Sequence, residues 1–70
     1  MCKEYKVAVE IVDDFVKEKD IFSYDELAQE IRKKGGVLRV AVGSTIDDYL
    51  EYYVTKGEIK FDRWSKVFYK

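Results

Sequence analysis

The sequence contains no histidine, no proline and no asparagine, and its only cysteine is Cys2. A single cysteine cannot form an intramolecular disulfide, and without histidine the usual zinc-binding spacings cannot be assembled. The common pairings of a nucleophile with a general base also need histidine or a well-positioned cysteine. We therefore expect no structural metal, no cofactor and no enzymatic activity.

Long apolar runs are absent as well. Hydrophobic residues make up 47% of the chain and charged residues 39%, a mixture that excludes a disordered polar chain. The uncharged runs are far too short to cross a bilayer, and the N-terminus lacks the apolar core of a signal peptide. The composition predicts a cytoplasmic protein without a membrane partner. Its few amides and many ionic residues are typical of a thermophile.

The length of 70 residues predicts a single domain over residues 1–70. A chain of this size buries only about 60–65% of its unfolded surface, so its core is thin. Aromatic residues make up 16% of the sequence, and their rings are expected to supply much of the buried area. Any exposed aromatic residues would suit a contact between two copies, and we expect a homodimer.

Charge is distributed unevenly along the chain, although the net charge is only −1. Residues 1–31 hold four lysines against nine acids, whereas residues 32–70 hold nine lysines and arginines against five acids. Such a chain can present one basic face while remaining acidic overall. The alternative is a chance fluctuation of charge over short windows.

Apolar spacing predicts the first helix over residues 4–19. Its stripe recurs at helical intervals and consists of Tyr5, Ala8, Val9, Val12, Phe15 and Val16. A strand is the alternative, because residues 5–11 also alternate between apolar and polar. The helical pattern continues to Lys19 without a turn signal, which favours the helix.

A short extended piece, Ile21-Phe22, is expected to precede a second helix over residues 23–34. Ser23 and Glu26 have the spacing of a capping box, and Gly35-Gly36 ends the helix. The β-branched residues 37–42 predict an extended connector that could pair with a strand.

The third helix is expected over residues 44–56, with Ser44 and Asp47 at its start and Gly57 as its stop. The side chains predicted to face inward are Ile46, Leu50, Tyr53 and Val54. Those predicted to face outward are Ser44, Thr45, Asp48, Glu51, Tyr52 and Thr55.

Two short alternating segments follow and predict an antiparallel hairpin, with residues 58–62 paired to residues 66–70 across Arg63-Trp64-Ser65. The residues expected on its inner face are Ile59, Phe61, Val67 and Tyr69. Lys60 is expected to stand near Lys66 or Phe68 on the outer face.

This order of elements resembles the winged helix-turn-helix family. Residues 21–28 look like the family's junction of strand and second helix, and residues 44–59 look like its third helix, glycine stop and first wing strand. The chain is also similar to small regulators of archaea and of their viruses and plasmids. The segment 35–43 is longer than the family's usual turn. The resemblance implies an α+β fold of three helices and a C-terminal β-hairpin wing.

The resemblance also implies binding to double-stranded DNA and a role in transcriptional regulation. In such folds the third helix, here 44–56, enters the major groove, while the wing, here 58–70, touches the backbone or minor groove. Ser44 and Thr45 suit phosphate contacts, and Arg63 beside Trp64 could lie against a groove wall. The full set of candidate DNA-binding residues is Arg39, Ser44, Thr45, Tyr52, Lys60, Arg63, Trp64 and Lys66.

Three alternatives remain at this point. Trp64 could fold back onto the core instead of contacting a ligand. Asp48 and Glu51 would repel phosphates unless one accepts a hydrogen bond from a cytosine amino group, and both could simply belong to a solvated helix face. An acidic third helix would also suit a winged helix that binds another protein instead of DNA.

Overall fold

The computed structural model describes residues 3–70 and shows a small α+β fold. Cys2, the single cysteine of the chain, lies outside this range. The elements in chain order are α1 (Lys3–Glu18), β1 (Ile21–Ser23), α2 (Tyr24–Lys33), β2 (Arg39–Ala41), β3 (Ser44–Thr45), α3 (Ile46–Lys56), β4 (Lys60–Asp62) and β5 (Val67–Tyr69). Across these residues, no helix is both long enough and apolar enough to span a bilayer.

The structure confirms the predicted stripe of the first helix and the predicted serine cap of the second. α1 is a continuous helix, so the strand alternative for residues 5–11 is wrong, and it buries Ala8, Val12 and Val16 at four-residue intervals. At the start of α2, the Ser23 Oγ accepts a hydrogen bond from the backbone N–H of Glu26 at 3.1 Å. The second helix therefore begins where its local pattern and its capping residue agree.

The predicted extended segment between α2 and α3 does pair with a strand, and together they form a short hairpin. β2 pairs antiparallel with β3, with Arg39 opposite Thr45 and Ala41 opposite Ser44. Gly43 has a φ of +80° at the turn, a conformation that side chains other than glycine rarely adopt. The predicted start of the third helix at Ser44 is therefore wrong, because Ser44 belongs to β3.

Thr45 caps α3 in place of Ser44. Its Oγ1 accepts a hydrogen bond from the backbone N–H of Asp48 at 3.4 Å, and the Asp48 carboxylate accepts one from the Thr45 N–H at 3.2 Å. The pairs Ser44–Asp47 and Thr45–Asp48 have the same spacing, so only the pairing of Ser44 in the hairpin decides between them. Gly57 ends the helix with a φ of +85°, as predicted.

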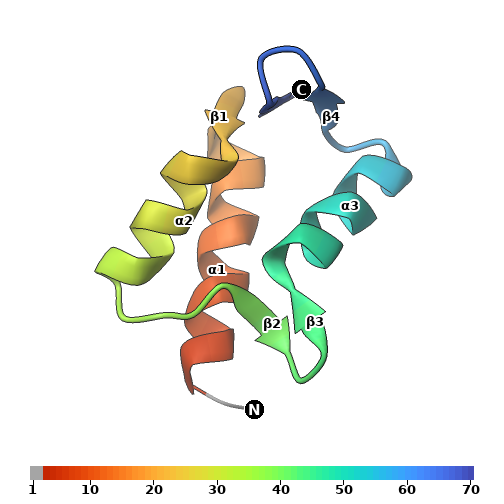
Figure 1. Ribbon diagram of the computed structural model, residues 1–70. Helices are drawn as coiled ribbons and strands as arrows, with labels where there is room; N and C mark the ends of the chain where they lie inside the picture. The colour runs from red at the N-terminus through yellow and green to blue at the C-terminus, as the bar shows by residue number, and fades with distance from the viewer. Residues whose placement is uncertain (1–2) are drawn as a thin grey trace.

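The three-stranded sheet has the order β1-β5-β4, with all neighbours antiparallel (Figure 1). Phe22, Phe68 and Phe61 lie opposite one another in its register. Phe68 is buried and Tyr69 is exposed, so the prediction that Val67 and Tyr69 face the core is wrong. The turn contains four residues, 63–66, instead of three, and a shift of one residue moves every β5 side chain to the opposite face.

Helix α1 lies behind α2 and α3 and contributes to a core shared by all three helices and the sheet (Figure 1). The buried core cluster consists of Ala8, Val12, Val16, Phe22, Leu27, Ile31, Ile46, Leu50, Ile59 and Phe68. A row of aromatic rings runs through it to the sheet edge, with centroids 5.4 Å apart for Phe15–Phe22, 5.4 Å for Phe22–Phe68 and 4.9 Å for Phe68–Phe61.

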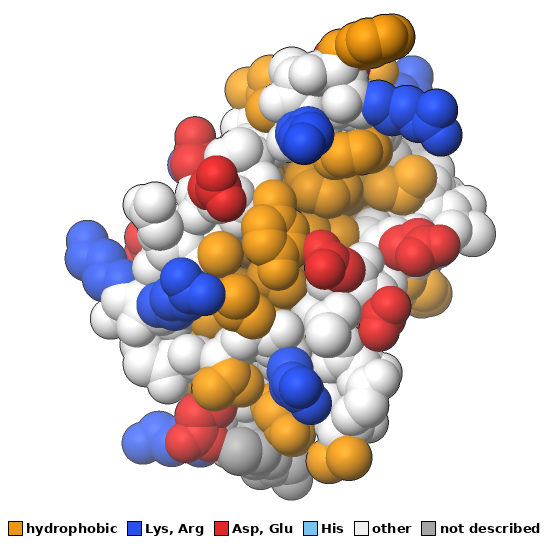
Figure 2. All heavy atoms as spheres, in the orientation of Figure 1, with side chains coloured by type: hydrophobic (Ala, Val, Ile, Leu, Met, Phe, Trp, Pro, Cys, Tyr) orange, Lys and Arg blue, Asp and Glu red, His pale blue; other side chains and the backbone are white. Residues whose placement is uncertain are grey.

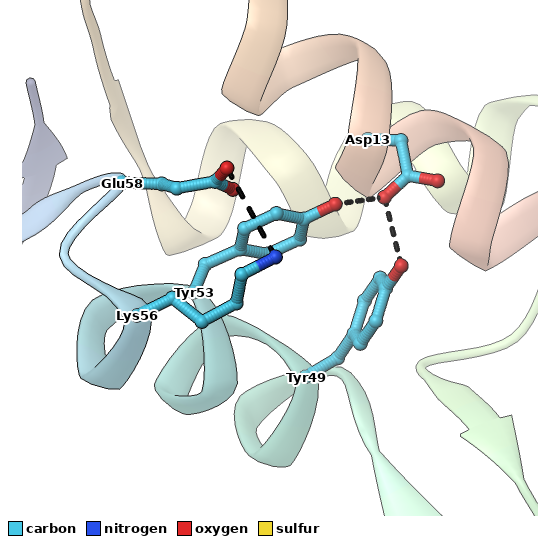
Figure 3. Close-up of polar contacts among 5 residues, drawn as sticks. All are labelled: Asp13, Tyr49, Tyr53, Lys56 and Glu58. Carbon is cyan, nitrogen blue, oxygen red and sulfur yellow. Dashed lines mark hydrogen bonds and ion pairs between the residues drawn. The ribbon is translucent and has the colours of Figure 1, made fainter.

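Hydrogen bonds between side chains also connect α3 to α1 (Figure 3). The Tyr49 hydroxyl donates to the Asp13 carboxylate at 2.8 Å, and the Tyr53 hydroxyl donates to the same oxygen. Burial, followed by the hydrogen bond to Asp13, raises the pKa of Tyr53 well above its ordinary value. At the C-terminal end of α3, the Lys56 ammonium lies 4.0 Å from the Glu58 carboxylate.

Candidate nucleic-acid interface

The C-terminal hairpin, residues 60–69, has a turn held by Asp62. The Asp62 carboxylate accepts a hydrogen bond from the Trp64 N–H at 2.9 Å, and the Asp62 carbonyl accepts one from the Lys66 N–H at 2.8 Å. The Trp64 N–H, followed by the Ser65 hydroxyl, lowers the pKa of the Asp62 carboxyl. Lys66 adopts a φ of 56°, which closes the turn. The sequence therefore forms a defined tip instead of an open loop.

The hairpin tip, defined here as Arg63, Trp64 and Lys66, projects into solvent. The Trp64 side chain is 95% exposed, so the alternative in which it folds onto the core is wrong. Arg63 and Lys66 are exposed beside it. Among residues 3–70, no carboxylate forms an ion pair with either of them or with Lys60. The tip therefore combines an apolar ring with two available cations.

Lys60 stands at the other end of the hairpin. It lies opposite Tyr69, which in turn lies opposite Ile21, so these three residues share the outer face of the sheet. The predicted position of Lys60 near Lys66 or Phe68 is wrong because it assumed the shorter turn. The Lys70 ammonium lies toward the end of α1, where it donates to the Lys17 carbonyl at 2.9 Å.

Three other candidate residues lie at the N-terminal end of α3. Arg39 is exposed on β2 opposite Thr45, while Ser44 is half-buried in β3. The Thr45 hydroxyl already accepts the hydrogen bond that caps the helix. Arg39 therefore supplies an exposed positive charge at the N-terminal end of α3.

Tyr52 occupies the exposed surface of α3 between the two ends. Its side chain is 53% exposed, and its ring stacks on Tyr49 with centroids 6.3 Å apart. The Lys56 ammonium lies 5.0 Å from the Tyr52 ring centroid, within the range of a cation–π contact. This contact places a positive charge over the C-terminal half of α3.

The candidate cations lie beyond the two ends of α3, with Arg39 at the N-terminal end and Lys60, Arg63 and Lys66 at the C-terminal end. The β2–β3 hairpin and the C-terminal hairpin lie at opposite ends of α3 (Figure 1), and a helix of 11 residues is about 16 Å long. Asp47, Asp48 and Glu51 are exposed on α3 between them. Figure 2 shows the same arrangement, with acidic side chains over α3 and basic ones beyond both of its ends.

A groove that the sequence did not predict lies between α3 and the C-terminal hairpin. This α3–hairpin groove has a volume of about 290 Å³ and is lined by Asp47, Glu51, Val54, Phe61 and Phe68. Hydrophobic side chains gather on this face beside the acidic ones (Figure 2). In the sequence, only Phe61 and Phe68 pointed to this groove. Their rings share one face of the hairpin only if the turn contains four residues.

In the part of the chain that the structure describes, no group of three or more acidic or cysteine side chains is placed to hold a metal ion. No family model matches the sequence, and comparison with curated proteins and with solved structures found no match.

Proposed function

We propose that the protein is a winged-helix domain that binds double-stranded DNA and regulates transcription. The hairpin tip is the observation that carries this proposal. It presents Arg63 and Lys66, which no carboxylate pairs among residues 3–70, on either side of the exposed Trp64. Cations in this arrangement neutralise phosphates, and the ring can lie against a groove wall.

The arrangement of elements supports the same proposal. α3 is followed directly by the C-terminal hairpin, in the order expected for a recognition helix and its wing. Pairing of β1 with β5 ties that hairpin to the start of α2, so the tip is held by the sheet and does not depend on a flexible arm. A rigid support of this kind reduces the entropy lost on binding.

The hairpin, and not α3, would supply most of the affinity. Asp47, Asp48 and Glu51 are exposed on α3 and would repel phosphates. Asp48 has a structural explanation, because its carboxylate completes the cap of the helix. Base contacts would then be limited to the start of α3, where Arg39 and Thr45 lie opposite each other.

The test is the salt dependence of duplex binding by a variant in which Lys60, Arg63 and Lys66 are replaced by alanine. Each lost phosphate contact should flatten the slope of log affinity against log salt by about 0.9, so the full change is up to about 2.7. All three side chains are exposed, so the fold should survive. The measurement is an electrophoretic mobility or anisotropy titration with duplex DNA at several salt concentrations.

A matched control replaces Lys6, Lys33 and Lys34 with alanine, which removes the same charge from exposed positions on α1 and near the end of α2. The control should leave the slope almost unchanged. An equal effect of both triple variants would mean that DNA is attracted by overall charge instead of by the hairpin. Absence of salt-sensitive binding to any duplex at low ionic strength would refute the DNA proposal.

A protein-interaction module is the second candidate function. It is favoured by the α3–hairpin groove, whose apolar floor is bordered by Asp47 and Glu51. Such a surface suits an apolar side chain flanked by cations better than it suits a phosphate backbone. This candidate would gain support if the wild-type protein failed to bind DNA in the titration above.

A further inference from the structure

The α3–hairpin groove is an unusual surface because apolar and acidic side chains meet there. Val54, Phe61 and Phe68 form its apolar part, and Phe61 remains 45% exposed at the outer edge of the aromatic row. Asp47 and Glu51 border it from the adjacent turns of α3. An occupant that matches this groove would bring an apolar group with positive charge on its flanks.

The hairpin tip of the same chain has these properties. Trp64 is 95% exposed and lies directly beside Arg63, with Lys66 two residues further along the turn. Trp64 cannot reach the groove of its own chain while it remains this exposed. Tryptophan and arginine are also the side chains most enriched among residues that dominate protein–protein binding energy.

We propose that the hairpin tip of one copy docks into the α3–hairpin groove of a second copy. Trp64 would cover Phe61 and Phe68, and Arg63 and Lys66 would approach Asp47 and Glu51. Charge complementarity selects this occupant, since the acidic border and the basic tip belong to one sequence. The proposal does not depend on DNA binding and is tested without DNA.

The exchange would be reciprocal, because each copy carries both a tip and a groove. A twofold axis allows both contacts to form at once and gives a closed dimer. One tryptophan buries about 150–250 Å², so two such contacts stay well below the roughly 1,200–2,000 Å² of a stable interface. The dimer should therefore be weak and exchange rapidly with the monomer.

The experiment uses Trp64 as a reporter, since it is the only tryptophan in the chain. Its fluorescence should shift to shorter wavelength as the protein concentration rises, because the ring leaves water when it enters the groove. Sedimentation velocity over the same concentrations should show a matching transition from monomer to dimer. Both signals are expected from the wild-type protein without any added ligand.

Two variants test the two sides of the contact. Trp64→Ala removes the anchor and Glu51→Lys reverses a charge at the groove, so each should weaken self-association by about tenfold or more. In Glu51→Lys the shift of the tryptophan emission should need a protein concentration about tenfold higher than in the wild type, or more. Glu18→Lys is the matched control, because it makes the same change at an exposed position at the end of α1 and should associate like the wild type.

Thermal unfolding of each variant establishes that its fold is intact, which is expected because all three positions are exposed. A monomer at every concentration would overturn the proposal. So would a dimer that tolerates both Trp64→Ala and Glu51→Lys. Loss of association in Trp64→Ala alone would show that the tip docks on a surface other than this groove, which would also overturn it.

Discussion

At the residue scale, the start of α3 depends on a reciprocal pair of hydrogen bonds. The Thr45 hydroxyl and the Asp48 carboxylate each accept from the other residue's backbone N–H. These contacts satisfy donors that a helix N-terminus leaves without partners. Asp48 also places a negative charge at the positive end of the helix dipole, which is favourable. Part of the acidic character of α3 is therefore structural.

This cap makes a prediction about two neighbouring hydroxyl residues. Thr45→Ala should lower the free energy of unfolding by about 1 kcal/mol, within the usual range of about 0.5–2 kcal/mol for a lost N-cap. Ser44→Ala is the matched control and should cost less, since Ser44 lies in β3 and does not cap the helix. Urea unfolding monitored by circular dichroism measures both. A larger loss for Ser44→Ala would contradict the observed cap.

At the element scale, α1 and α3 are joined by the two tyrosine hydroxyls that share the Asp13 carboxylate (Figure 3). Desolvation by burial is the main reason that the pKa values of Tyr49 and Tyr53 are raised. The folded protein thus holds these phenolic protons more tightly than the unfolded chain does. Because ionisation of these tyrosines is coupled to unfolding, the packing of α1 against α3 should weaken at alkaline pH.

The sign of this effect follows from the raised pKa values. The stabilisation is fully present below the ordinary tyrosine pKa of 10.0 and is lost as the pH rises above it. We expect the urea midpoint to fall from about pH 10 upward. Tyr53→Phe should flatten this fall and cost about 1 kcal/mol at neutral pH. Tyr52→Phe is the control, because the exposed Tyr52 side chain makes no hydrogen bond to Asp13. If the urea midpoint of Tyr53→Phe fell as steeply above about pH 10 as that of the wild type, the proposed contribution of Tyr53 would be contradicted.

At the scale of the whole molecule, one thin core supports every candidate functional surface. Leu50 on α3 and Ile59 before β4 are both at most 2% exposed, and they pack in the same cluster as the buried residues of α1 and α2. The hairpin that carries the tip is anchored through Phe68 in that cluster. Damage to the core should therefore disturb the candidate interface together with the fold.

Leu50→Ala tests this dependence. The change should destabilise the protein by about 2–5 kcal/mol, a large part of the roughly 5 kcal/mol expected of so small a domain. The melting temperature should fall steeply, and the variant should be largely unfolded when warmed. Tyr52→Ala, on the exposed face of the same helix, should have a much smaller effect. An unchanged melting temperature for Leu50→Ala would mean that the core is not as described.

The three helices and the C-terminal hairpin were predictable from the sequence, whereas strand β3 was not. The stripe of α1, the Ser23 cap of α2 and the Gly57 stop of α3 all depend on residues within one or two turns of each other. Spacing of three or four residues determines which side chains share a helix face, and a capping residue acts on backbone groups three positions away. The hairpin was predictable too, because alternation over residues 58–70 has the period of a strand.

The candidate site was decided by tertiary structure. The hairpin register depended on whether Lys66 belonged to the turn, and that single residue determined whether Phe68 or Tyr69 faced the core. The separation of Arg39 from the hairpin tip depended on the β2–β3 pairing, which links residues across a glycine turn. The α3–hairpin groove depended on the hairpin register, which places Phe61 opposite Phe68. Composition and periodicity report local preference, whereas these features arise from pairing and packing between segments that are distant in sequence.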